Sequence, residues 1–241
     1  MTDYLIFRLY GPMSAWGDIA VGEVRPSYTH PSKSAVTGLI AAALGISRDK
    51  EALHQQLAKG YGFAVRVDAI GTPLSDYHTA QVPPSGTGRN RINFATRRDE
   101  IVTLPKEKLN TILSKRDYRL DAMATAILWP RTSPPYSLPK LAEALQYPTY
   151  TLYLGRKSCP LALPVEAQVV TADTLKDALN KVKFADWPGL SSSDSPSLYW
   201  EEDANSGISP QHTFSLRDMP LSRKRWQFDV RREYHGSLKE D

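Results

Sequence analysis

The residues best suited to chemistry in this sequence are cations and aromatic side chains beside glycine, serine and proline. His30-Pro31-Ser32-Lys33-Ser34 places hydroxyls and an ammonium group directly before an apolar, helix-like segment. Backbone amides at the start of a helix attract anions, so Lys33 and Ser34 are predicted to bind a phosphate. Ser32 is the candidate N-cap of this helix, and capping alone would explain a serine but not a lysine among the caps.

A second candidate lies in the stretch 150–157, where Tyr150 and Tyr153 precede Gly155, Arg156 and Lys157. Bases stack on aromatic rings and phosphates pair with cations, so this stretch is suited to RNA. Core tyrosines beside a solvated turn explain it equally well. Trp226 and Phe228 are two residues apart and are predicted to share one face of a sheet, in the core rather than on a base-stacking surface.

Catalytic motifs are weaker. Asp76-Tyr77-His78 could supply a general base for RNA cleavage by the neighbouring 2′-hydroxyl, with Lys33 or Arg156 on the phosphate. A histidine that only supports the following loop is the favoured interpretation of this motif. The five histidines are scattered and Cys159 is the single cysteine, so we expect neither a metal site nor a disulfide. The glycines near 86–91 lack a nucleotide-binding pattern, and we expect no cofactor.

The distribution of charge is more informative than its total. The 241 residues carry 30 Lys and Arg against 26 Asp and Glu, a net charge of +4. Residues 89–119 carry nine basic and four acidic residues, and residues 217–232 carry six basic and two acidic residues. Residues 166–203 have the opposite balance, with three basic and eight acidic residues. This segregation indicates a basic face for a phosphate backbone, although an uneven solvated surface would look the same. The chain has no membrane-length apolar run and no leader-like start, so we expect a cytoplasmic protein without a membrane partner.

Hydrophobic periodicity predicts the elements that position these residues. Helices are expected at 34–44, 48–59, 104–114, 138–145 and 174–182. Strands are expected at 4–10, 63–69, 118–128, 151–154, 165–171 and 225–231. Residues 186–205 look like a loop, and the segment after 81 is long and irregular. The first strand, two helices and second strand form half of a ferredoxin-like unit, so the predicted class is α+β.

Several of these stretches together resemble a known family. They are Tyr4–Leu9 followed by Gly11-Pro12-Met13-Ser14-Ala15-Trp16-Gly17, then Arg25-Pro26, Pro31–Ser34, Gly38–Ile46, Asp76–Thr79 and Tyr153–Leu161. The sequence resembles CasD, the fifth Cas family of repeat-associated (RAMP) proteins, in its type I-E Cascade form. The resemblance extends over nearly the whole chain, and the Gly-Pro-Met-x-Ala-Trp-Gly and Tyr-Leu-Gly-Arg-Lys-Ser-Cys-Pro blocks are specific.

The resemblance implies a fold and a role. The fold would be a modified RRM-like, ferredoxin-type domain at 1–135 with a long hairpin (thumb) insertion at about 82–112. Residues 136–241 would form a smaller, β-rich C-terminal part packed on the same core. The role would be that of a non-catalytic subunit, present once in a CRISPR surveillance complex, that holds the 5′ handle of the guide crRNA. Its partners would be the backbone subunit and the large PAM-reading subunit, with target DNA engaged indirectly.

On this interpretation the predicted RNA contacts come from several stretches. Lys33 and Ser34 would take a handle phosphate, with Arg25 and Arg48 as secondary contacts, and Met13 and Trp16 would pack against bases. The remaining contacts would be His78, Tyr153, Arg156 and Lys157, together with Arg89, Arg91, Arg97 and Arg98 in the thumb.

Two other functions stay open from the sequence. One is a metal-independent endoribonuclease that processes repeat RNA, using His78 or His30 with Tyr77 or Tyr28, as the related type I-C protein cleaves with Tyr, His and Lys. The other is a protein-interaction module without RNA contact.

Overall fold

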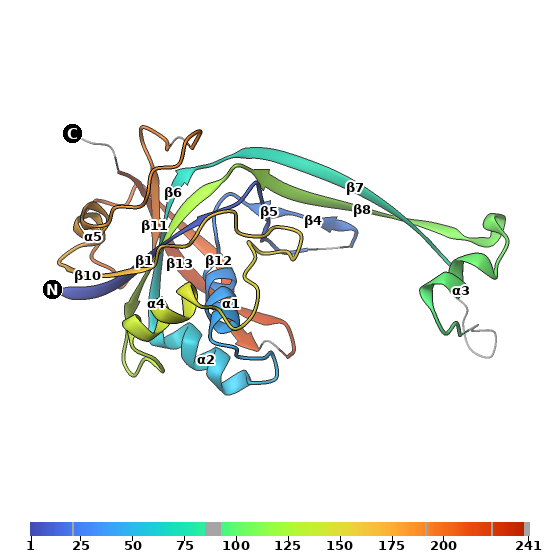
Figure 1. Cartoon of the computed structure of the whole chain (residues 1–241), viewed down its shortest axis with the longest axis horizontal. Coiled ribbons are helices and arrows are strands. Elements are labelled where there is room, and N and C mark those ends of the chain that lie inside the picture. The colour runs from blue at the N-terminus through green and yellow to red at the C-terminus, as the bar shows by residue number, and fades with distance from the viewer. Residues whose placement is uncertain (21, 85–92, 191, 223, 239–241) are drawn as a thin grey trace.

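A sheet-based body carries one long arm (Figure 1). The computed structural model describes residues 1–20, 22–84, 93–190, 192–222 and 224–238. The body is built on a seven-stranded antiparallel sheet with the strand order β10-β1-β9-β6-β11-β13-β12. Its strands are β1 (Thr2–Tyr10), β6 (Tyr61–Ala69), β9 (Met123–Pro130), β10 (Gln168–Ala172), β11 (Ser197–Trp200), β12 (His212–Ser222) and β13 (Gln227–Ser237).

Helices cover both faces of this sheet. They are α1 (Lys33–Ala43), α2 (Glu51–Gly60), α4 (Leu138–Gln146) and α5 (Leu175–Lys181). Alternate residues of β1 point to opposite faces, as a strand requires: Leu5 and Phe7 pack in one core with α1, α2 and α4, and Tyr4 and Ile6 pack in a second core with α5. Burial on both faces explains why β1 is a nearly continuous apolar run.

The arm is a long two-stranded hairpin of β7 (Thr72–Val82) and β8 (Asn110–Leu120). Its distal end carries α3 (Arg97–Val102) and the 3-10 turn η2 (Lys106–Lys108). Every residue of β7 is half-buried or exposed, so the arm stands away from the core. The hairpin is longer than the expected 82–112, since its strands begin at Thr72 and end at Leu120.

Four short strands lie between β1 and α1. They are β2 (Met13–Ser14), β3 (Trp16–Gly17), β4 (Val24–Arg25) and β5 (Ser27–Tyr28). β2 and β4 pair with β8, and β3 pairs with β5. The segment after β1 is thereby attached to the base of the arm.

The mixed α+β class predicted from the sequence is confirmed, and several local predictions are wrong. Residues 151–154 form only a single bridge, between Tyr153 and Pro160. The helix expected at 104–114 is the short turn η2 followed by the first half of β8. The loop expected at 186–205 contains β11, and β12 was not predicted because its sequence is polar and includes a proline, which disfavours a strand.

Candidate nucleic-acid interface

The inner end of β8 is where separate segments of the chain meet. Met13 of β2 pairs with Leu120, and Arg25 of β4 runs parallel to β8 with Arg116 as its partner. These ladders add to the pairing of β8 with β7. The side chains of the segment after β1 therefore lie beside those of the arm's base.

Arg156 joins the loop at 153–160 to this junction. Its Nη1 donates to the carbonyl of Asp117 at 3.1 Å, and its Nη2 donates to the carbonyl of Arg25 at 3.0 Å. The guanidinium also lies 4.6 Å from the ring centre of Tyr118. Because these contacts engage the guanidinium with the protein itself, we assign Arg156 a positioning role beside any bound strand.

The same loop depends on a glycine for its close approach. Gly155 has φ of +86°, and a Cβ there would lie 1.8 Å from the carbonyl oxygen of Ala15. Next to it, the Ala15 amide donates to the Leu154 carbonyl at 3.0 Å. Only glycine fits both this conformation and this contact. Tyr153, on the same loop, is half-buried.

The junction gathers cations from three stretches of sequence. We define the junction patch as Arg25, Lys115, Arg116, Arg119, Arg156 and Lys157. Arg25, Arg116 and Lys157 are exposed, and Met13 lies half-buried beside them. Two carboxylates share the arm's strands: Asp117 is 3.9 Å from Lys115, and Asp76 pairs with Arg116 across the ladder. Exposed cations around an open strand ladder can hold the phosphates of a single-stranded nucleic acid.

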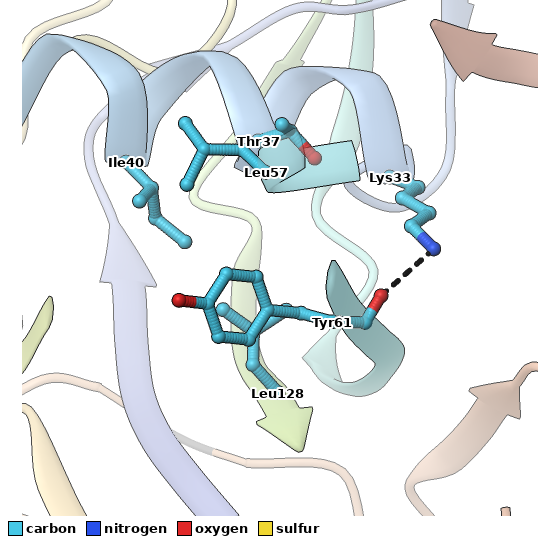
Figure 2. A pocket seen from close by; sticks show the side chains of 6 residues that line it. All are labelled: Lys33, Thr37, Ile40, Leu57, Tyr61 and Leu128. Carbon is cyan, nitrogen blue, oxygen red and sulfur yellow. Dashed lines mark hydrogen bonds between the residues drawn. The ribbon is translucent and has the colours of Figure 1, made fainter. Parts of the chain in front are cut away.

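The structure does not support Lys33 as a phosphate ligand. Its side chain is 1% exposed and turns inward, where Nζ donates to the Tyr61 carbonyl at 3.0 Å and to Glu201 at 2.9 Å. Figure 2 shows the ammonium directed at the Tyr61 carbonyl, beside a cavity of about 10 Å³. That volume suits one water molecule and excludes a nucleotide. Burial lowers the pKa of Lys33 to about 8.

The anion site predicted at the start of α1 exists, but a carboxylate of the protein fills it. The Lys33 amide donates to Asp218 Oδ2 at 2.7 Å, and Asp218 in turn accepts from Arg231. Ser32 is the N-cap and accepts from the Ala35 amide, as expected. The Ser34 hydroxyl lies 3.1 Å from that of Ser32. An external phosphate at this position would have to displace Asp218.

Trp16 and Arg48, also predicted to contact RNA, both lie outside the junction patch. Trp16 is 4% exposed and packs in the core with α1, so it is not available to stack on a base. Its side chain instead anchors the segment after β1. Arg48 is exposed after α1, and its guanidinium lies 5.9 Å from the ring centre of Trp226. The structure thus brings Arg48 to the β12–β13 turn.

The predicted thumb residues lie along the arm. Arg97 and Arg98 are exposed on α3, and Arg97 donates to the Gln81 carbonyl and pairs with Glu100. His78 is exposed on β7, with Nε2 at 2.5 Å from Asp76 Oδ2. Arg89 and Arg91 lie outside the described residues.

Of the residues predicted to cleave RNA, Tyr28 and His30 lie near each other, with ring centres 6.5 Å apart, whereas Tyr77 and His78 point apart. Tyr77 and His78 are consecutive in β7, so their side chains point to opposite faces of the strand. His30 is buried, donates to Glu233 at 3.1 Å and stacks on Tyr199. Burial, together with a hydrogen bond to Asp18, raises the pKa of Tyr28 above its ordinary value.

Comparison with known proteins identifies the family. A family model described as CRISPR-associated protein (Cas_Cas5) matches residues 4–234. The chain belongs to the Cas5 family.

Relatives and solved structures agree with this assignment. The Cas5 chain is 36% identical over 173 residues to the CRISPR system Cascade subunit CasD of Escherichia coli (strain K12). This alignment covers 68% of the Cas5 chain and 70% of the relative. It resembles a chain of a solved "CRISPR RNA-guided surveillance complex" with a TM-score of 0.66 and 25% identity, covering 97% of this chain and 89% of that one. A "Crystal structure of Cas protein" shares the fold, with a TM-score of 0.64, 23% identity and coverage of 98% and 95%.

Sequence reasoning missed the central cations of the junction patch in this Cas5 chain. Lys115, Arg116 and Arg119 were counted in a basic segment, but none was assigned to a site. Four polar residues in succession, from Ser114 to Asp117, hide this part of the strand from hydrophobic periodicity, so the sequence carried no signal for these cations.

Two kinds of feature are absent from the described residues of the Cas5 chain. Among these residues, no helix is both long and apolar enough to cross a membrane. The same residues contain no group of three or more His, Cys, Asp or Glu side chains that could hold a metal ion.

Proposed function

We propose that this Cas5 chain is a non-catalytic subunit of a type I-E CRISPR surveillance complex (Cascade) that binds the 5′ handle of the guide crRNA. The observation that carries the proposal is the junction patch, where exposed Arg25, Arg116 and Lys157 surround the base of a long arm. A strand of RNA lying there would place its phosphates on these cations and leave its bases and 2′-hydroxyls open to be read. The Cascade subunit CasD of E. coli, its relative, supports the assignment to this complex.

The topology of the fold supports this proposal. We interpret β1, α1, α2, β6, β9, α4 and β10 as a modified RRM-like unit, because their order β10-β1-β9-β6 is the ferredoxin-like arrangement. The arm is inserted between β6 and β9, and β11, β13 and β12 extend the sheet. In this arrangement the arm and the junction patch hold the RNA, while the body is left to contact the neighbouring subunits.

The remaining parts of the proposal concern partners. We assign the backbone subunit and the large PAM-reading subunit as the protein neighbours, and we place the assembly in the cytoplasm with only indirect contact to target DNA. The junction patch would take the handle, with Met13 and Tyr153 near its bases and Arg97 and Arg98 on the RNA that follows.

The proposal is tested with end-labelled repeat RNA in EDTA, run on native and denaturing gels. We expect a shifted complex on the native gel and intact RNA on the denaturing gel. Site-specific cleavage that is lost in His78→Ala or His30→Ala would overturn the proposal in favour of an endoribonuclease. A protein that leaves the RNA unshifted would favour a protein-interaction module.

A further inference from the structure

The β12–β13 turn is a second basic region that the proposed function does not use. It falls within the basic stretch 217–232, and it lies against α2 on the side of the body away from the base of the arm (Figure 1). Trp226 on this turn is 61% exposed, which corrects the expectation that it belongs to the core. Phe228 beside it is half-buried.

The turn is held in place by its contacts to α2. The Lys224 amide donates to Glu51 Oε2 at 3.1 Å, and Gln55 Nε2 donates to the Leu221 carbonyl at 3.0 Å. Within the turn, the Arg225 amide donates to Ser222 Oγ at 3.0 Å. These contacts hold the backbone that precedes Trp226.

Trp226 has an uncommon backbone conformation for a bulky residue. Its φ is +56°, in the left-handed region that favours glycine. Its ring system makes a T-shaped contact with Phe228, with ring centres 5.5 Å apart and planes at 88°. The turn thus presents a large, mostly exposed aromatic group in a backbone conformation that is rare for one.

Exposed cations come from the turn and from the loop that faces it. Exposed Arg48 and Lys50 come from the loop after α1, and exposed Lys224 and Arg225 come from the turn. The guanidinium of Arg48 lies 5.9 Å from the centre of the Trp226 ring. The acids that adjoin Lys50, Asp49 and Glu51, have partners within the protein, because Asp49 pairs with Lys50 and accepts from Ser47, and Glu51 accepts from the Lys224 amide.

We propose that this turn patch, made of Arg48, Lys50, Lys224, Arg225 and Trp226, binds a stretch of single-stranded nucleic acid. A base stacks on the indole of Trp226, and the adjoining phosphates pair with the four cations. An aromatic platform among cations is the combination that binds single strands without sequence preference. An acidic peptide would use the cations but has no flat group to match the exposed indole.

The test is a titration of fluorescent oligo(dT) and oligo(U), about 12 nucleotides long, followed by anisotropy. Every protein in the titration is the full chain with Arg116→Ala and Lys157→Ala, which weakens binding at the junction patch. The titration therefore reports on the turn patch whether or not the proposed function is correct. In this background we expect Trp226→Ala to weaken binding about tenfold, while Trp226→Tyr keeps most of it because stacking is retained. Lys224→Ala with Arg225→Ala should lower the slope of log K against log salt by about 1.4.

The matched control is Lys140→Ala with Lys176→Ala, which removes the same charge from α4 and α5. The proposal is overturned if this control weakens binding as much as the turn variant, or if Trp226→Ala binds like its parent. A third outcome would also overturn the proposal. If neither Trp226→Ala nor Lys224→Ala with Arg225→Ala weakens oligonucleotide binding, and the patch binds a Glu-rich peptide equally well with and without Trp226→Ala, the patch is a site for a protein partner. Equal binding of the two oligomers would assign the site to either nucleic acid, and tighter binding of oligo(U) would assign it to RNA through the 2′-hydroxyl.

Discussion

Lys33 ties the start of α1 to several strands of the sheet. Its ammonium group donates to Glu201, which follows β11, and to the Tyr61 carbonyl in β6. Its amide donates to Asp218 in β12. Glu201 also accepts from Arg131, so the lysine belongs to a buried ionic network rather than to a ligand site.

Removing the Lys33 ammonium should destabilise the fold. Lys33→Met leaves Glu201 buried with one partner fewer, so we expect the free energy of unfolding to fall by about 3 kcal/mol in denaturant titrations. The matched substitution of an exposed lysine, Lys157→Met, should change it by less than about 0.5 kcal/mol. Equal effects of the two substitutions would contradict the network assigned to Lys33.

The lowered pKa of Lys33 also predicts a pH dependence. Burial lowers the pKa to about 8, against 10.5 in the unfolded chain. Between these values the unfolded state binds more protons, so Lys33 makes stability rise with pH across this window. The free energy of unfolding of the wild type, relative to Lys33→Met, should therefore increase from pH 8 to pH 10.5. A difference that stays flat or falls would show that the pKa is not lowered.

At the residue scale, the sequence was enough to predict the N-cap of α1 but not the direction of the Lys33 side chain. Ser32 before an apolar periodic segment was enough to predict the start of α1, and the structure confirms it. The inward turn of Lys33 depends on Glu201, 168 residues away. Local spacing carries no information about such a partner.

At the scale of elements, the loop at 153–160 is what fixes the junction patch. It was expected to follow a strand at 151–154, but it is held by one bridge, by Arg156 and by the close approach of Gly155 to Ala15. The contacts of Arg156 and Gly155 join it to the segment after β1, which precedes it by more than a hundred residues. The tyrosine-rich pattern signalled a special segment, but its geometry depends on this distant contact.

Gly155→Ala should disturb both stability and RNA binding. A methyl group at this φ meets the Ala15 carbonyl, so we expect a loss of about 3 kcal/mol in the free energy of unfolding and weaker binding of handle RNA. Gly189→Ala is a matched control, since Gly189 has φ of +84° with nothing within 4 Å of its Cβ position. It should cost about 1 kcal/mol and leave RNA binding unchanged. If both substitutions behaved alike, the close contact would not be what positions the loop.

At the scale of the whole molecule, the body and the arm have separate tasks. The sheet of the body carries both apolar cores, whereas α3, η2 and β7 bury none of their residues within the part of the arm that the structure describes. β1, α1, α2 and β6 could be predicted because their apolar residues repeat with clear periods, but the two-residue strands β2 to β5 are too short to show a period. The arm could not, because its strands have exposed faces and few apolar residues, so periodicity gave no signal.

Shortening the arm should separate RNA binding from stability. Val82 and Asn110 are paired, so residues 83–109 can be replaced by an Asn-Gly turn. We expect the Tm to change by less than about 4 °C, because none of the described residues of the removed segment is buried. Affinity for handle RNA should fall by about tenfold or more, since six basic and three acidic residues are removed. Full affinity in the shortened protein would show that the arm takes no part in binding.

The central claim is that the junction patch holds the phosphates of the handle. The most direct measurement is the affinity for end-labelled handle RNA, in EDTA, as a function of salt for the wild type and for Arg116→Ala with Lys157→Ala. Removing two phosphate contacts to a single strand should lower the slope of log K against log salt by about 1.4, while the RNA stays intact. Lys140→Ala with Lys176→Ala should keep the wild-type slope. A slope unchanged in the junction variant, or equal losses in both variants, would contradict the account.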